Sequence, residues 1–249
     1  MIVFFVFLLL PVISFAAQEA AENHTIADNL TDEVLPRTDP RTVGLFYDLM
    51  MKIDTVFQQS NLRYWATCGT LLGVVRHGGM IPWDDDIDIA ISAQDISSLK
   101  NTRSELAKLG LELYYDPNLK FYKIFYKNGK PTYHKNGIDT YPWTYPYVDV
   151  FPLANIDGKI TYTYAGWQKK YPGDYYWPSE IASPLPLMPF GPLTIPVVHN
   201  AVNYLVRMYG SDWNDVAYVQ YDHQEQHGLK RVKVKLINRS PPSYILPSQ

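Results

Sequence analysis

The chain has 249 residues, of which 47% are hydrophobic and 19% are charged, and this composition suits a globular domain with a full-sized core. Its 22 Lys and Arg residues against 25 Asp and Glu residues give a net charge of −3, so no basic field is present to hold a nucleic-acid backbone, and DNA or RNA is not expected as a partner. The single cysteine, Cys68, excludes an intrachain disulfide and a cysteine-based zinc site.

The N-terminus has the pattern of a targeting segment. Residues 2–15 are nearly all apolar, and Ser14-Phe15-Ala16 places small residues at the two positions that a signal peptidase reads. The run contains Pro11 and is shorter than the roughly 20 residues that a membrane-spanning helix needs. We therefore expect a signal peptide at residues 1–16, with a short membrane anchor as the alternative. The protein would contact a membrane only if this segment stayed uncleaved.

Residues 17–38 are polar and lack hydrophobic periodicity, which predicts a flexible stalk. Two N-glycosylation sequons fall within it, at Asn23 and Asn29. Together with the signal sequence they predict a glycoprotein of the secretory pathway, either in the Golgi lumen or secreted. The globular domain is then expected to cover residues 39–249.

Hydrophobic periodicity and turn residues divide the domain into helices and strands. Asp39-Pro40 begins a helix whose apolar residues recur at helical spacing as far as Phe57, which predicts a helix that packs on the core. The later segments predict further strands at 61–67, 83–91, 111–115, 121–126 and 147–153, and further helices at 71–76, 95–109 and 199–209.

An acidic run opens the strand expected at residues 83–91. Side chains alternate between the two faces of a strand, so the core face would hold Ile87, Ile89 and Ile91. The opposite face would hold Asp84, Asp86 and Asp88, and Asp85 would point away from them. Carboxylates this close repel one another unless a cation neutralises them, and hard oxygen ligands suit Mg²⁺ or Mn²⁺. We therefore predict a metal site here, with a solvated acidic turn as the alternative.

A second strand repeats this pattern around Asp149. Its neighbours Val148 and Val150 face one way, which leaves Asp149 on the other face. If the two strands are neighbours, Asp149 lies beside Asp86 and Asp88 and adds a fourth metal ligand. Carboxylates so placed can hold two ions about 4 Å apart, an arrangement used for in-line phosphoryl transfer. The alternative for Asp149 is a surface residue on an edge strand.

Upstream of the acidic run, Gly69-Thr70 lies where a strand enters a short helix. Free backbone N–H groups and the threonine hydroxyl at such a point are typical of a phosphate-binding helix start, although an ordinary turn with a threonine cap has the same sequence. Two cations are further candidates to bind a donor phosphate. Arg76 could bind it bidentately or be a surface arginine. Lys123, mid-strand among aromatic residues, could bind it or lie on a solvated strand face.

The order of strand, Gly-Thr, short helix, Asp-apolar-Asp strand and later strand Asp is similar to that of the DNA polymerase β superfamily of nucleotidyltransferases. Within it, residues 68–89, CGTLLGVVRHGGMIPWDDDIDI, resemble the signature of the LicD family, which includes bacterial phosphocholine transferases and fukutin-like proteins. Further matches at 121–124, 147–152 and 209–213 extend the resemblance over most of residues 45–215. The resemblance implies an α+β nucleotidyltransferase fold, with a small mixed β-sheet flanked by helices.

The resemblance also implies an activity. Such enzymes cleave a CDP-linked alcohol, of the choline or ribitol type, and pass its phospho-group to a glycan hydroxyl with release of CMP. We therefore expect a metal-dependent phosphotransferase with a CDP-linked donor and a glycan or glycoprotein acceptor. By position, the resemblance implies that the catalytic carboxylates are Asp86 and Asp88, which would bind the metal, and Asp149, which would bind the metal or accept the proton of the hydroxyl. One alternative is a catalytically inactive relative that binds nucleotide or glycan, but such a protein gains nothing from a set of repelling carboxylates. Another is an enzyme that forms a nucleotide-sugar, but the secretory signal argues against it.

Overall fold

The computed structural model describes residues 30–134, 137–219, 221–228 and 233–247. The expected signal peptide and both sequon asparagines, Asn23 and Asn29, lie outside the described residues. Within the described ranges, no helix combines the length and apolar character that crossing a bilayer requires.

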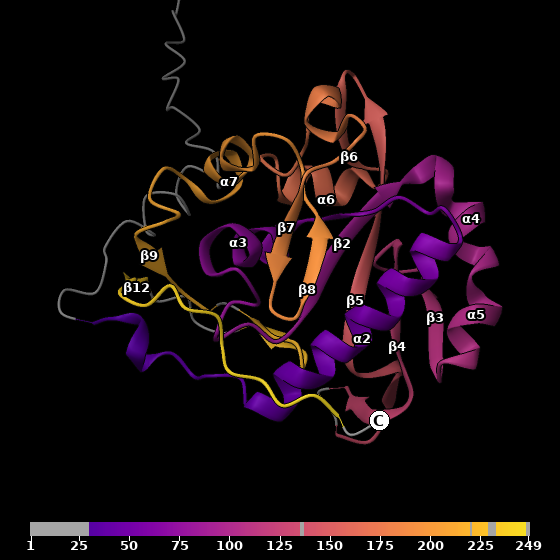
Figure 1. The fold of residues 1–249 in the computed structure, drawn as a ribbon, viewed down its shortest axis with the longest axis horizontal. Coiled ribbons are helices and arrows are strands. Elements are labelled where there is room, and N and C mark those ends of the chain that lie inside the picture. The colour runs from indigo at the N-terminus through magenta and orange to yellow at the C-terminus, as the bar shows by residue number, and fades with distance from the viewer. Residues whose placement is uncertain (1–29, 135–136, 220, 229–232, 248–249) are drawn as a thin grey trace, which may run out of the picture.

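A mixed sheet forms the centre of the fold, with strand order β1-β2-β5-β4-β3 and β6 paired to β5 (Figure 1). Strand β2 runs parallel to β5, whereas every other pairing in this sheet is antiparallel. This confirms the predicted α+β class. The strands of the sheet are β1 (Trp65–Ala66), β2 (Ile87–Ser92), β3 (Leu111–Asp116), β4 (Phe121–Tyr133), β5 (Thr140–Ile156) and β6 (Lys159–Tyr162).

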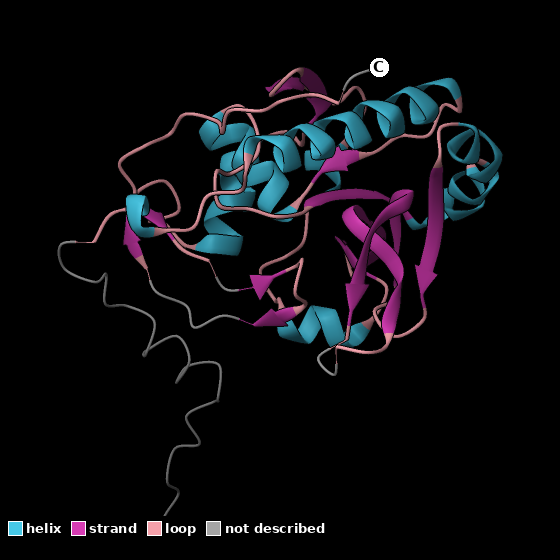
Figure 2. Ribbon diagram, turned by 90° about the horizontal axis from the view of Figure 1, so that it is seen from below, coloured by secondary structure: helices cyan, strands magenta, loops and turns pink. Residues whose placement is uncertain are grey.

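The longest helix, α2 (Pro40–Gln59), lies over the sheet (Figures 1 and 2). The Asp39 carboxylate caps its first turn by accepting the N–H groups of Arg41 and Thr42. The apolar face predicted from the sequence, including Phe46 and Ile53, is fully buried. The other α-helices are α3 (Cys68–His77), α4 (Ile96–Asn101), α5 (Arg103–Lys108), α6 (Ala165–Lys170) and α7 (Ala201–Tyr209).

The helix predicted at 95–109 is two short helices, α4 and α5, which meet at Thr102. The Thr102 hydroxyl is buried and donates a hydrogen bond to the Leu99 carbonyl, which lets the chain turn between them. Both helices lie at the β3 edge of the sheet, whereas α3 and α7 lie at the β1–β2 end (Figure 1).

Small elements complete the fold. The Pro-rich stretch after residue 171 contains a 3₁₀ helix and a hairpin, and two short strand pairs follow near the C-terminus. The remaining strands are β7 (Leu187–Phe190), β8 (Leu193–Pro196), β9 (Val216–Ala217), β10 (Tyr221–Asp222), β11 (His227–Gly228) and β12 (Val234–Lys235), and the 3₁₀ helices are η1 (Asp32–Val34), η2 (Ala93–Asp95) and η3 (Pro178–Ile181).

The described part of the expected stalk, residues 30–38, is packed against the domain. The Asp32 carboxylate is fully buried, accepts the backbone N–H groups of Ile237 and Asn238, and pairs with Arg37 at 2.9 Å. In this stretch the polar side chain of Asp32 therefore binds the C-terminal segment.

Candidate metal centre

The acidic run precedes strand β2 instead of forming its first half. The strand begins at Ile87, so residues 84–86 belong to the preceding loop. The predicted alternation of side chains between the two faces holds from Ile87 onward, where Ile87, Ile89 and Ile91 are fully buried as predicted. The alternation does not apply to Asp84 and Asp85, because side chains in a loop do not alternate between two faces.

Three of the predicted carboxylates meet where β2 lies beside β5. Asp88 on β2 and Asp149 on β5 are direct cross-strand partners in the parallel register. Together with Asp86, each offers a carboxylate oxygen, and these atoms all lie within 4.8 Å of one another. All three side chains are buried. The prediction that the two strands are neighbours is therefore confirmed, and this cluster could hold a metal ion.

Burial and mutual repulsion both disfavour the ionised state of these carboxylates. Burial, followed by the charges of Asp86 and Asp149, raises the pKa of Asp88 well above its ordinary value. Burial and the charge of Asp86 likewise raise the pKa of Asp84. A divalent cation reverses this preference, because it pairs with the charges that otherwise repel. The hard-oxygen donor set and its spacing fit Mg²⁺ or Mn²⁺.

Lys123 supplies a positive charge at the edge of the cluster. It lies opposite Asp149 in the β4–β5 pairing, and its Nζ is 2.6 Å from Asp149 Oδ1. Lys123 is only 2% exposed, and its ammonium group lies over the ring of Tyr147 at 3.8 Å. Burial raises the pKa of Asp149 to about 6, although Lys123 acts in the opposite direction. Lys123 is thus close to the predicted site, with its charge directed at Asp149.

The start of helix α3, where Gly69-Thr70 predicts a phosphate-binding end, lies against the carboxylates. A Cβ atom on Gly69 would lie 2.9 Å from Asp84 Oδ2, so any larger residue would displace this carboxylate. The Thr70 hydroxyl accepts the N–H of Asp88 at 2.7 Å. Thr70 therefore fixes the start of β2 against α3, a role that the sequence did not reveal.

Arg76 is held by contacts with the segment after α7. Its side chain is buried, and its NH1 group donates to the carbonyls of Trp213 and Val216 at 2.8 and 3.1 Å. Its Nε donates to His77 Nε2 at 2.9 Å. The structure therefore gives Arg76 an anchoring role for the segment after α7, and its predicted phosphate contact stays a prediction.

His223 is a site residue that the sequence reasoning missed. It lies between β10 and β11, where its Nδ1 is 2.6 Å from Asp85 Oδ1 and its Nε2 is 3.0 Å from Asp86 Oδ2. Burial alone would lower the pKa of His223, but Asp86 and Asp85 outweigh it and raise that pKa to about 10. Asp85, which was expected to point away from the other carboxylates, is therefore part of the site. No local signal marks His223, because 137 positions separate it from Asp86 in the chain.

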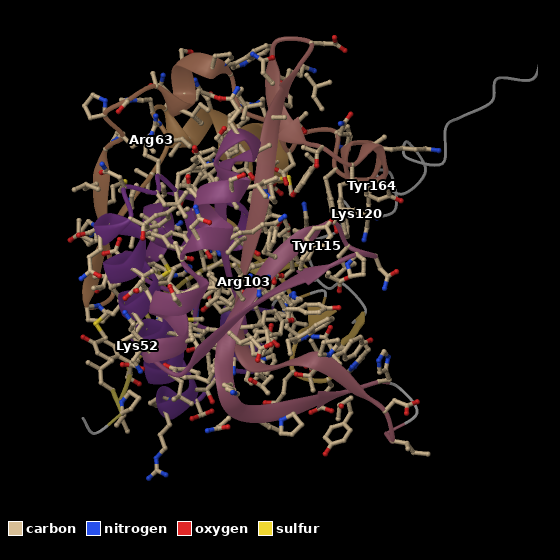
Figure 3. All side chains as sticks on the ribbon, turned by 90° about the vertical axis from the view of Figure 1, so that its right-hand side faces the viewer. Lys52, Arg63, Arg103, Tyr115, Lys120 and Tyr164 are labelled. Atoms are coloured by element: carbon tan, nitrogen blue, oxygen red, sulfur yellow. The ribbon has the colours of Figure 1, made fainter. Side chains whose placement is uncertain are left out.

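Two hollows lie near these elements. One, of about 580 Å³, is lined by Lys52, Tyr126, Lys130, Tyr145 and Gln224, so it borders the segment that carries His223. The other, of about 490 Å³, is lined by Lys100, Arg103, Tyr115, Lys120 and Tyr122. Figure 3 looks onto the side that carries Arg103, Tyr115 and Lys120. Because Tyr122 precedes Lys123 in β4, the second hollow lies on the sheet face opposite to the carboxylates.

Comparison with known families gives one match over much of the domain. The family model described as "LicD/FKTN/FKRP, nucleotidyltransferase domain" matches residues 61–200, which include Gly69, the acidic loop and Asp149 but exclude His223. A solved structure of lincomycin-bound lincosamide antibiotic adenylyltransferase LnuA aligns with a TM-score of 0.40 at 15% identity, over 73% of this chain and 92% of that one.

Individual relatives share about a quarter of their aligned residues with this chain. An uncharacterized protein of Rickettsia prowazekii is 28% identical over 177 residues, which cover 71% of this chain and 58% of the relative. The Ribitol 5-phosphate transferase FKRP of Homo sapiens is 28% identical over 134 residues, which cover 48% of this chain and 27% of the relative. The chain therefore spans little more than half of the rickettsial protein and about a quarter of FKRP.

Proposed function

The chain belongs to the LicD/FKTN/FKRP family, and we propose that it is a metal-dependent transferase that moves a phospho-alcohol from a CDP-activated donor to a glycan hydroxyl, releasing CMP. The observation that carries the proposal is the buried cluster of Asp86, Asp88 and Asp149, with Lys123 beside it. The similarity to a ribitol 5-phosphate transferase supports a phospho-alcohol as the transferred group.

In the proposed reaction an acceptor hydroxyl oxygen attacks the phosphorus that carries the alcohol. The bond from this phosphorus to the bridging oxygen breaks, CMP leaves with that oxygen, and the hydroxyl proton passes to a base. A divalent cation held by Asp86, Asp88 and Asp149 would supply charge neutralisation for the phosphoryl oxygens. Thr70 and Gly69 set the positions of Asp88 and Asp84, so they act on the reaction through the carboxylates.

Asp149 is suited either to bind the cation or to accept the proton. Its pKa of about 6 lies near neutral pH, where a general base works best. Lys123 occupies Oδ1, which leaves Oδ2 for a ligand or a proton. We propose that Lys123 positions Asp149 and reaches a donor phosphate only by leaving this ion pair.

The direct test is CMP release from purified protein with CDP-choline, CDP-ribitol or CDP-glycerol in the presence of Mn²⁺. We expect CMP release from one of these donors. Asp86→Asn and Asp88→Asn should each reduce the rate of CMP release by at least 100-fold. The matched control is Asp157→Asn, which removes an exposed carboxylate in a β5–β6 turn. Metal binding without CMP release from any donor would favour an inactive, ligand-binding relative.

We also propose that the protein acts in the secretory pathway, in the Golgi lumen or after secretion, and that Asn23 and Asn29 carry glycans. The support is the apolar N-terminal segment and the two sequons. Expression in a eukaryotic cell should give a protein whose mobility increases after glycosidase treatment. The Asn23→Gln/Asn29→Gln variant should lose most of this shift, and an unchanged shift would count against both sites.

A further inference from the structure

Asp85 ties the segment between β10 and β11 to the acidic loop through both of its carboxylate oxygens. Asp85 Oδ2 accepts the backbone N–H of His223 at 2.7 Å, and that of Gln224 at 3.4 Å. Asp85 Oδ1 faces Nδ1 of the His223 ring at 2.6 Å. One side chain therefore fixes both the backbone and the ring of the residue that reaches the cluster.

This contact decides which ring nitrogen faces the cluster. A carboxylate accepts hydrogen bonds, so Nδ1 carries the proton and donates it to Asp85. The other nitrogen, Nε2, is directed at Asp86 Oδ2. In metal sites a carboxylate commonly holds one histidine nitrogen in this way so that the other can bind the ion.

The spacing at Asp86 fits a shared ion. Two ligand atoms that each lie about 2.1 Å from a cation, at right angles, are about 3 Å apart. His223 Nε2 and Asp86 Oδ2 are 3.0 Å apart, and the group of Asp85, Asp86 and His223 has ligand atoms within 4.8 Å of one another. We propose that His223 Nε2 and Asp86 ligate a second cation, with Asp85 as the residue that positions the imidazole. Asp86 would then bridge this ion and the one held with Asp88 and Asp149.

The donor set also indicates which ion this site takes. Imidazole nitrogen suits first-row transition metals, whereas Mg²⁺ is bound mainly by oxygen. The second site should therefore select Mn²⁺ over Mg²⁺, while the all-carboxylate group of Asp86, Asp88 and Asp149 accepts either. This inference rests on the metal dependence proposed above, and it adds a ligand from outside the region that matches the family.

A competing role for His223 is that of a permanent counter-ion. A doubly protonated imidazolium could pair with Asp85 and Asp86 and replace a metal charge. The two roles differ in one observable, because only a ligand places a nitrogen nucleus directly on the ion.

Pulsed EPR of the full chain with bound Mn²⁺ makes this distinction. We expect a ¹⁴N modulation from a coordinated imidazole, and we expect Mg²⁺ in excess to leave this nitrogen-coupled Mn²⁺ in place. The modulation should disappear in His223→Ala and persist in His227→Ala, a matched control on the same hairpin. Asp85→Asn should weaken Mn²⁺ binding at this site by 10- to 100-fold while the ¹⁴N signal persists at saturating metal.

The outcomes separate this inference from the proposed function. Bound Mn²⁺ without ¹⁴N coupling, unchanged coupling in His223→Ala, or no Mn²⁺ binding by the wild type would each overturn the ligand role of His223. Because His223→Ala could disturb the hairpin, the wild-type spectrum gives an independent check, and bound Mn²⁺ without ¹⁴N coupling there contradicts the ligand role whatever the variant does. A ¹⁴N-coupled ion in a protein that releases no CMP from any donor would support the site and contradict the transferase activity.

Discussion

Asp88 and Asp149 face each other across β2 and β5, the parallel strand pair at the centre of the sheet. Two buried carboxylates in register repel each other, and Asp86 lies against both. Lys123 compensates part of this charge from the other side of Asp149. The metal-free cluster therefore stores an electrostatic cost that a bound cation would relieve.

Removing one of the repelling charges should stabilise the metal-free protein and impair metal binding. For Asp88→Asn we expect a gain of about 1 kcal/mol in unfolding free energy in EDTA, because the amide keeps the shape but carries no charge. Mn²⁺ affinity should fall at least tenfold. Urea unfolding and Mn²⁺ titration measure the two effects, with Asp157→Asn as the control. Unaltered Mn²⁺ affinity would show that Asp88 is not a ligand.

The Lys123–Asp149 pair should show strong coupling. Lys123→Met leaves Asp149 buried without its partner and should cost about 3 kcal/mol of stability. Adding Asp149→Asn should recover most of that loss, because no buried charge is then unpaired. A double-mutant cycle from denaturant unfolding gives the coupling energy. If the double variant is less stable than Lys123→Met, the two side chains do not act as a pair.

The stability of the metal-free protein should fall as the pH rises from about 4 to about 6. The pKa of Asp149 is raised from 3.8 to about 6 by burial, so in this window the folded state holds a proton that the unfolded state has released. For Asp149 alone this amounts to about 3 kcal/mol. Thermal unfolding in EDTA across this range checks the sign, and Asp149→Asn should flatten the curve. Stability that rises across the window in the wild type and not in Asp149→Asn would contradict the raised pKa.

Thr70 should matter through its hydroxyl alone. Thr70→Val leaves the buried N–H of Asp88 without an acceptor and should cost about 2 kcal/mol, together with weaker Mn²⁺ binding. Thr70→Ser retains the hydroxyl and should preserve most of both properties. A loss in Thr70→Ser as large as that in Thr70→Val would show that the methyl group matters as much as the hydroxyl, and would contradict this prediction.

Arg76 should prove structural. Arg76→Met leaves the carbonyls of Trp213 and Val216 without their donors and should cost about 2 kcal/mol of stability. Mn²⁺ affinity and the KM for the donor should stay near wild-type values below the unfolding temperature. A selective rise in donor KM, at unchanged stability, would restore the phosphate-binding role.

Local patterns in the sequence predicted most of the elements and which carboxylates lie together. The helical spacing after Pro40 predicted α2, and alternation around Ile89 and Asp149 predicted β2 and β5 with the correct faces. These features follow from side-chain periodicity within one element, which a sequence displays directly. The family resemblance was also visible in residues 68–89, because that block is contiguous.

Only the tertiary structure decided what each polar group in the site contacts. The expected alternation of faces placed Asp85 away from the site, because that expectation assumed a strand that began before Ile87. In the structure residue 85 lies in a loop, and its side chain points toward His223. Arg76 lies within the family-like block of residues 68–89, but its side chain donates a hydrogen bond to the carbonyl of Trp213, beyond α7. Hydrogen bonds and ion pairs between distant segments depend on how the chain packs, and neither residue type nor spacing along the chain specifies that packing. The sequence therefore identified the carboxylates, and the fold supplied their partners.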